Sequence, residues 1–122
     1  MKFRYARHTN NLKSITSFYT NIIGLEVLGS FENHSEYNGV FLGLSNQDWH
    51  IEFTQSDEKA AHHPDEDDLL VFYLSEGELA QVKVNIEKYG IPRVQPKNPY
   101  WQEHGIEIKD PDGFGVVITS LF

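Results

Sequence analysis

Two side chains capable of proton or metal chemistry lie two residues apart in the run His50-Ile51-Glu52. Side chains alternate between the two faces of a β-strand, so His50 and Glu52 share one face if this run is extended. A histidine can accept a proton near neutral pH, and a histidine with a carboxylate can supply part of a metal site. A third metal ligand would have to come from His8 or, through a loop, from His104. The alternative is a hydrogen-bonded structural histidine.

Aromatic side chains form a second candidate binding feature. The segment 98–104, which is predicted to be a loop, carries Tyr100 and Trp101 next to each other. Adjacent large aromatics in a connector favour a lid or wall over a ligand. Tyr73, on the same face of a predicted strand as Leu69, is a further candidate wall residue. Alternatively, Trp101 fills the end of the fold or makes a dimer contact.

The composition excludes several classes of function. The 122-residue chain is 39% hydrophobic and 23% charged, which is ordinary for one folded domain. It has no cysteine, so disulfides, thiolate metal sites and cysteine nucleophiles are excluded. The longest apolar run, Leu69 to Leu74, is far shorter than the roughly 20 residues of a membrane-spanning helix. No apolar signal-peptide core follows Met1, so we expect a cytoplasmic protein without a membrane partner.

The net charge of −8 lies mainly in one segment. Residues 57–68 hold six acids and one lysine, or −5, which leaves −3 for the other 110 residues. We interpret this acidic connector as a solvated, mobile link in which His62 and His63 would bind metal only adventitiously. No basic stripe with interleaved aromatics occurs, so we expect no nucleic-acid partner.

The same order of elements is predicted on both sides of the acidic connector. In each half, a strand is followed by a helix that ends at a glycine, Gly24 or Gly90, and then by three strands. Asn10 or Asn11 is expected to cap the first helix. The expected strands are 3–8, 25–31, 40–44, 49–54, 69–74, 91–94, 106–109 and 114–121.

Matched glycines indicate that the two halves are repeats. Gly24 and Gly39 are 15 residues apart, and so are Gly90 and Gly105. We therefore predict an α+β fold of two βαβββ repeats. The expected single domain, 1–122, is divided into a first unit, 1–56, the connector 57–68 and a second unit, 69–122. Each unit would leave one sheet face unburied, so the two must pack together, within the chain or across a dimer.

Two motifs resemble those of the vicinal oxygen chelate superfamily. They are Phe18-Tyr19 followed by Gly24-Leu25 near the start and Asp110-Pro111-Asp112-Gly113-Phe114 near the end. The superfamily includes glyoxalase I, extradiol dioxygenases, fosfomycin-resistance thiol transferases and bleomycin-resistance proteins. The resemblance implies that each unit forms a half-barrel and that the two make the paired half-barrel of the glyoxalase-like fold. It also implies a divalent metal, held by the first and last strands of both units.

The metal ligands of that superfamily match this sequence at one position of four. The first-strand positions fall on Arg4 and Leu69, and the last-strand positions fall on Glu52 and Val117. Arginine stays protonated, and leucine and valine have no donor atoms, so only Glu52 could bind a metal. The resemblance therefore implies a branch without a metal cofactor. A divalent metal bound in a different strand register, with Asp68 in place of Leu69, is the alternative.

At the position of the family's metal, Arg4 and Glu52 would face each other. We interpret Arg4 as an anchor that offers paired donors to an anionic or zwitterionic ligand. The alternative is a structural ion pair that binds nothing. The candidate ligand-binding residues are thus Arg4, His50, Glu52, Tyr73, Tyr100 and Trp101.

Three functions are compatible with the sequence. The first is metal-independent binding or sequestration of a small amphipathic molecule by a homodimer, as the resemblance to bleomycin-resistance proteins implies. The second is a metal-dependent lyase, isomerase or dioxygenase that uses His50 and Glu52. The third is a structural or regulatory dimerisation module whose cleft is filled by its own side chains. The sequence alone does not decide between an enzyme and a binding protein.

Overall fold

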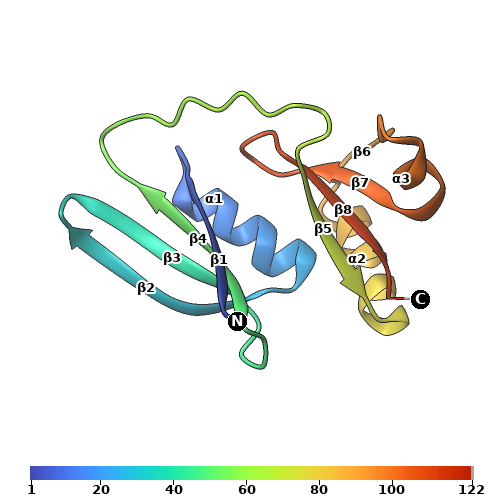
Figure 1. Ribbon diagram of the computed structural model, residues 1–122, viewed down its shortest axis with the longest axis horizontal. Helices are drawn as coiled ribbons and strands as arrows, with labels where there is room; N and C mark the ends of the chain where they lie inside the picture. The colour runs from blue at the N-terminus through green and yellow to red at the C-terminus, as the bar shows by residue number, and fades with distance from the viewer. Residues whose placement is uncertain (122) are drawn as a thin grey trace. The chain divides into compact units, whose positions relative to one another are not determined.

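A computed structural model describes residues 1–121 of the protein, which form two compact units (Figure 1). Unit 1 spans Met1–His62, and unit 2 begins at His63. Each unit contains one four-stranded sheet. No helix within residues 1–121 is long and apolar enough to cross a membrane.

Unit 1 is a βαβββ module in which the first strand lies beside the last. The sheet order is β1-β4-β3-β2, with β1 parallel to β4 and the other pairs antiparallel. A parallel pair needs a long crossover connection, which the helical segment and two strands supply here. The elements are β1 (Phe3–His8), α1 (Leu12–Ser17), the π-helix η1 (Phe18–Ile23), β2 (Glu26–His34), β3 (Tyr37–Gly43) and β4 (Trp49–Gln55).

Unit 2 repeats this topology. Its sheet order is β5-β8-β7-β6, and again the first strand is parallel to the last. The elements are β5 (Leu69–Leu74), α2 (Glu76–Lys88), β6 (Arg93–Val94), α3 (Pro99–His104), β7 (Ile106–Lys109) and β8 (Gly115–Ser120). The prediction of an α+β fold with two βαβββ repeats is therefore confirmed.

The helical segment of unit 1 covers one face of its sheet. Tyr19 on η1 is fully buried and stacks on Phe53 of β4, with 5.4 Å between ring centroids. Leu42 of β3 is buried on the same face. Because side chains alternate along a strand, His50 and Glu52 of β4 lie on the opposite face, away from the helix.

Local signals explain where the first helix begins and ends. The side chain of Asn11 accepts a hydrogen bond from the backbone N–H of Ser14 at 3.0 Å, which makes Asn11 the N-cap. The predicted single helix is α-helical only to Ser17 and continues as a π-helix. It ends at Gly24, whose φ of 93° is the left-handed conformation that glycine adopts most easily.

Two predictions about connecting segments were wrong. Segment 98–104 is the short helix α3 rather than a loop: Asn98 accepts from the Tyr100 N–H at 3.0 Å, and Pro99 occupies the first helical turn. The connection between the predicted strands 25–31 and 40–44 is also shorter than expected, because β2 extends to His34 and β3 begins at Tyr37, which leaves Ser35 and Glu36 as the turn. Both turn residues have positive φ, as a tight two-residue hairpin turn requires.

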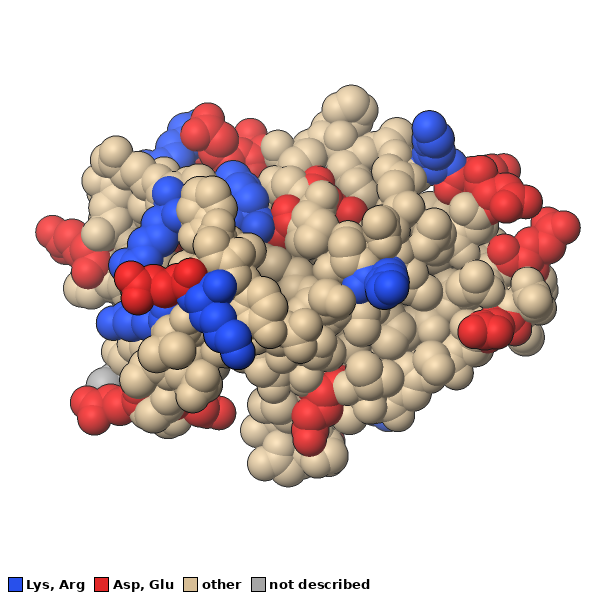
Figure 2. All heavy atoms as spheres, turned by 180° about the vertical axis from the view of Figure 1, so that it is seen from behind, with Lys and Arg blue, Asp and Glu red and all other residues tan. Residues whose placement is uncertain are grey.

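The acidic connector, interpreted above as a solvated, mobile link, makes hydrogen bonds to unit 1 in its first half. The Ala60 N–H donates to the side-chain oxygen of Asn10 at 2.8 Å. The imidazole Nε2 of His62 donates to the backbone carbonyl of His8 at 2.7 Å. Further along, the Asp65 N–H donates to the carboxylate of Asp68 at 2.9 Å, which closes a turn before β5. The face drawn in Figure 2 carries both acidic and basic side chains.

Tight packing at Gly105 gives a prediction for the stability of unit 2. A Cβ atom at Gly105 would lie 2.7 Å from Cγ1 of Val117 and 3.2 Å from Cε3 of Trp101. Gly105→Ala should therefore lower the free energy of unfolding by about 1–3 kcal/mol, because it overpacks the contact between α3 and β8. Urea unfolding measures this change.

Gly77 in α2 provides the matched control. A Cβ there would meet no described atom within 4 Å outside its own helix and chain neighbours. Gly77→Ala should raise stability by about 0.4–1 kcal/mol, because alanine restricts the unfolded chain. Equal stability of the two variants would contradict the packing described for Gly105.

Candidate functional site

Three of the predicted site residues form a polar cluster on the open face of the sheet in unit 1. The pairing of β1 with β4 places Arg4 opposite His50 and Ala6 opposite Glu52. The Arg4 guanidinium donates from Nε to Nε2 of His50 at 3.1 Å and from Nη1 to Oε1 of Glu52 at 3.3 Å. The predicted pairing of Arg4 with Glu52 is thus present in the structure, and His50 joins it.

The contact with Arg4 fixes the protonation state of His50. Arginine is always protonated, so Nε2 of His50 must accept this hydrogen bond with its lone pair, and the ring proton is on Nδ1. Burial lowers the pKa of His50, and the positive charges of Arg4 and Lys2 lower it further, while Glu52 acts in the opposite direction. His50 is therefore neutral at neutral pH, with its Nε2 lone pair already engaged.

Aromatic rings form a row beside this cluster. The Arg4 guanidinium lies over the ring of Phe41 at 5.5 Å from the centroid. Phe41 contacts His50 edge-on, with 5.6 Å between centroids, and lies 5.8 Å from Phe31 on β2. The Phe31 ring packs directly over Gly39, because glycine has no side chain that would clash with it. The floor of the open face is thus aromatic, with the cation of Arg4 at one end.

Phe31 and Phe41 were not among the predicted site residues. The alternation along the strand shows that Phe41 lies on the opposite face from Val40 and Leu42, but it does not show which residue of the next strand lies beside it. Its place beside Glu52 depends on the register between β3 and β4, in which Phe41 is directly opposite Glu52.

The residues present do not fit the divalent metal that the fold family implies. Within residues 1–121, no three His, Cys, Asp or Glu side chains are grouped so that they could hold an ion. His8, a suggested third ligand, contacts the Thr54 hydroxyl through Nδ1 at 2.8 Å and the Glu58 carbonyl through Nε2 at 3.1 Å. His104, the other suggestion, lies on α3 of unit 2 beside Glu103.

The three predicted aromatic residues also come together, in unit 2. The ring centroids of Tyr73 and Trp101 are 6.4 Å apart, and those of Tyr100 and Trp101 are 4.8 Å apart. Tyr73 and Tyr100 are exposed, and Trp101 is half-buried between them. Trp101 thus links the two exposed tyrosines to the packed part of unit 2.

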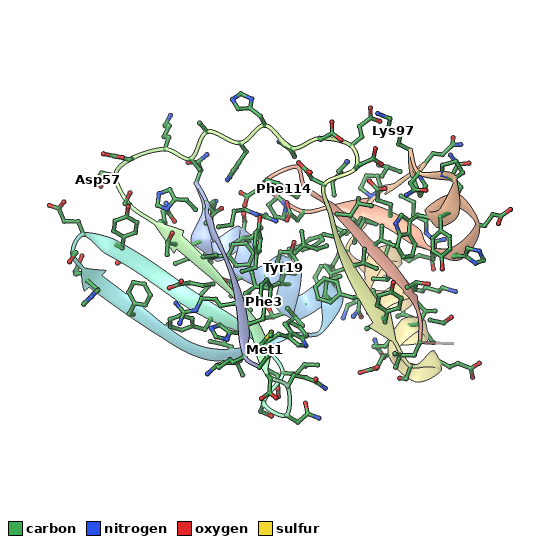
Figure 3. All side chains as sticks on the ribbon, in the orientation of Figure 1. Met1, Phe3, Tyr19, Asp57, Lys97 and Phe114 are labelled. Carbon is green, nitrogen blue, oxygen red and sulfur yellow. The ribbon has the colours of Figure 1, made fainter. Side chains whose placement is uncertain are left out.

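A pocket of about 550 Å³ lies next to Trp101, which is within the size range of small-molecule sites. It is formed between β5 and the segment that enters α3, where Lys97 is labelled in Figure 3. Tyr73 and Tyr100 do not line it. The residues that line it are Asp67, Leu69, Val71, Lys97, Asn98, Pro99 and Trp101.

Unit 2 has a buried carboxylate that the sequence analysis did not single out. Glu107 on β7 is 3% exposed and lies opposite Val117, the position at which the resemblance implies a metal ligand. Its Oε2 is 3.3 Å from Nζ of Lys109, and its Oε1 has no hydrogen-bond partner among the described residues. The alternation Ile106-Glu107-Ile108-Lys109 places the two charges on one face and was the available signal.

Comparison with known proteins finds two matching family domains. The YycE-like N-terminal domain matches residues 3–54, and the YycE-like C-terminal domain matches residues 67–120. An uncharacterized protein YycE of Bacillus subtilis (strain 168) is 40% identical over 121 residues, which is 98% of this chain and 87% of the relative.

Solved structures show the same fold. A YycE protein of unknown function from Bacillus subtilis has a TM-score of 0.88 and 38% identity, over 99% of this chain and 90% of that chain. Glyoxalase I of Leishmania major has a TM-score of 0.74 and 17% identity, over 96% and 84%. The fosfomycin resistance protein FosX from Mesorhizobium loti has a TM-score of 0.70 and 13% identity, over 98% and 90%. The predicted glyoxalase-like fold of the vicinal oxygen chelate superfamily is confirmed.

The lowered pKa of His50 gives a prediction with a defined sign. Below the ordinary value of 6.5, the unfolded chain binds a proton at His50 more readily than the folded chain. This residue therefore makes stability fall as the pH drops through about 6.5. Arg4→Gln should raise the pKa of His50 partway to 6.5, and Glu52→Gln should lower it further. An NMR titration of the His50 ring protons measures both changes.

Lys13→Gln is the control, because Lys13 lies on α1, which covers the other face of the sheet. This variant should leave the pKa of His50 unchanged. An Arg4→Gln variant with an unchanged pKa of His50 would contradict the contact between the two side chains.

Proposed function

This chain belongs to the YycE-like family, and we propose that it binds and sequesters a small amphipathic molecule carrying an anionic group. The observation that carries the proposal is that Arg4 is exposed and has an unused hydrogen-bond donor. Its side chain is 53% exposed, whereas that of Glu52 is 14% exposed. Arg4 contacts its neighbours through Nε and Nη1, and Nη2 has no partner among the residues described. A planar guanidinium with donors to spare is suited to a carboxylate, sulfonate or phosphate.

The aromatic row supports an amphipathic ligand. An anion held by Arg4 would place its apolar part over Phe41 and Phe31, which follow Arg4 diagonally across the sheet. Aromatic rings contribute a large apolar contact area with little loss of side-chain freedom. In this proposal Tyr73, Tyr100 and Trp101 give unit 2 an aromatic contact surface of its own.

Binding without a reaction is favoured over the metal-dependent lyase, isomerase or dioxygenase. The Nε2 lone pair of His50, which a general base would need, accepts the hydrogen bond from Arg4. Glu52 contacts Arg4 through Oε1, so a metal or proton that used both His50 Nε2 and Glu52 would have to displace Arg4 from His50. The homodimer and the cytoplasmic location expected from the sequence are part of this proposal.

Replacement of Arg4 tests the anchor. With 1-naphthoate as an aromatic anion, Arg4→Gln should weaken binding about tenfold, because it removes a charge-assisted hydrogen bond. Binding of the uncharged 1-naphthamide should change little. The Arg4 side chain is exposed, so the free energy of unfolding should fall by less than about 1 kcal/mol. Isothermal titration and urea unfolding provide the two measurements.

Lys13→Gln removes a positive charge from the opposite side of the same unit and should leave both affinities unchanged. An Arg4→Gln variant that unfolds more easily but binds 1-naphthoate as tightly as the parent would show that the pair is structural.

Elemental analysis tests the absence of metal chemistry. Protein purified without a histidine tag should contain no stoichiometric metal, because one carboxylate at the family's four ligand positions cannot hold a divalent ion. Its melting temperature should not respond to Ni²⁺, Zn²⁺, Mn²⁺ or Fe²⁺. A stoichiometric metal together with strong stabilisation by one of these ions would favour the enzyme instead.

A further inference from the structure

The pocket of unit 2 contains two opposite charges that do not neutralise each other. Asp67 and Lys97 both line the pocket, and neither side chain forms an ion pair or hydrogen bond with another described residue. Asp67 is held in place through its backbone, which donates to Asp65 at 2.9 Å, so its carboxylate is left open. The Asn98 side chain uses its oxygen to cap α3, which leaves its NH₂ group as a further donor.

The rest of the pocket is apolar. Leu69 and Val71 project from the same face of β5, since they are two residues apart on one strand. Pro99 and Trp101 face them from the first turn of α3. These four side chains offer a surface for an aliphatic or aromatic group, with the polar residues at its margin.

A charged pair lies beside Leu69 on the same face of the sheet. Leu69 Cδ2 and Glu107 Oε2 lie 2.6 Å and 2.9 Å from the point where a Cβ on Gly115 would be, so the two side chains approach the same spot. Glu107 is in turn paired with Lys109 at 3.3 Å. The charges of Glu107 and Lys109 thus offset each other, and the charged residues that line the pocket are Asp67 and Lys97.

We propose that this pocket binds an amino-acid-like zwitterion with an apolar side group. The ammonium of the ligand contacts Asp67, its carboxylate contacts Lys97 and the NH₂ group of Asn98, and its side group packs against Trp101 and Leu69. A ligand with a single charge would meet one group of like sign, whereas a zwitterion matches both. The pocket of about 550 Å³ has room for a molecule of this size. This site goes beyond the binding proposed at Arg4 and lies in the other unit.

Three probes that share a phenyl ring on a two-carbon chain separate the two charges. L-phenylalanine carries both, phenethylamine lacks the carboxylate and 3-phenylpropionate lacks the amine. Binding is followed by NMR through the indole N–H of Trp101. The other tryptophan of the chain, Trp49, lies in unit 1 and serves as an internal reference. We expect L-phenylalanine to shift the Trp101 signal and not that of Trp49, and to bind about three- to tenfold more tightly than either analogue.

Variants that remove the charge of Asp67 or of Lys97 test the two proposed contacts with the ligand. Asp67→Asn and Lys97→Gln should each weaken L-phenylalanine binding about three- to tenfold, without loss of fold, because both positions are exposed. Asp67→Asn should leave 3-phenylpropionate binding no weaker, and Lys97→Gln should leave phenethylamine binding no weaker. Glu66→Gln removes a neighbouring exposed charge that does not line the pocket, and it should have no effect.

The inference is overturned if L-phenylalanine leaves the Trp101 signal unchanged at millimolar concentration. It is also overturned if the three probes bind equally, or if neither variant changes the affinity for L-phenylalanine. Arg4→Gln separates this site from the proposed function. Loss of 1-naphthoate binding in Arg4→Gln, with no response of Trp101 to L-phenylalanine in the parent protein, would leave the proposed function standing and this inference refuted. The reverse pattern would refute the proposed function alone.

Discussion

The parallel pairing of the first strand with the last strand is the constraint on which each module depends. It requires a long crossover, and in unit 1 the helical segment of that crossover covers the face of the sheet that carries Phe53. The opposite face must then hold side chains that tolerate exposure. The same pairing sets Arg4 directly across from His50, so residues 46 positions apart in the sequence form one cluster. The backbone pairing that closes the sheet is therefore also what assembles the candidate site.

The two modules fill equivalent positions with different chemistry. In unit 1 the last strand carries the carboxylate of Glu52, and the neighbouring strand carries Phe41 directly opposite. In unit 2 the last strand carries Val117, and the carboxylate is on the neighbouring strand, at Glu107. The acid thus lies on the last strand in unit 1 and on the neighbouring strand in unit 2, where the last strand carries an aliphatic residue instead. Unit 1 thus presents a polar cluster beside an aromatic row, whereas unit 2 buries its acid beside Lys109 and presents an apolar wall.

Features that depend on residues close together in the sequence could be predicted, and features that depend on strand register could not. The cap at Asn11, the helix end at Gly24 and the order of elements follow from local patterns, and the structure has them. Helix α3 was missed because two aromatics in a short segment suggested a loop, although Asn98-Pro99 is a helix-start signal. Phe41 and Glu107 were missed because periodicity gives a face along one strand and does not identify the cross-strand neighbour.

Arg4 stands where the resemblance implies a metal ligand, and this changes the chemistry of the site. Its positive charge is carried by N–H donors, which bind hydrogen-bond acceptors. A metal accepts lone pairs from its ligands, whereas Arg4 requires acceptors, and it takes one from His50 and one from Glu52. The Nε contact exists only while His50 is neutral, since imidazolium has no lone pair on Nε2. Burial and the charges of Arg4 and Lys2 lower the pKa of His50 and so keep it in the neutral form that this contact needs. The cluster is therefore built to hold one cation in a fixed position near neutral pH, and that arrangement serves recognition of an anion better than transfer of a proton.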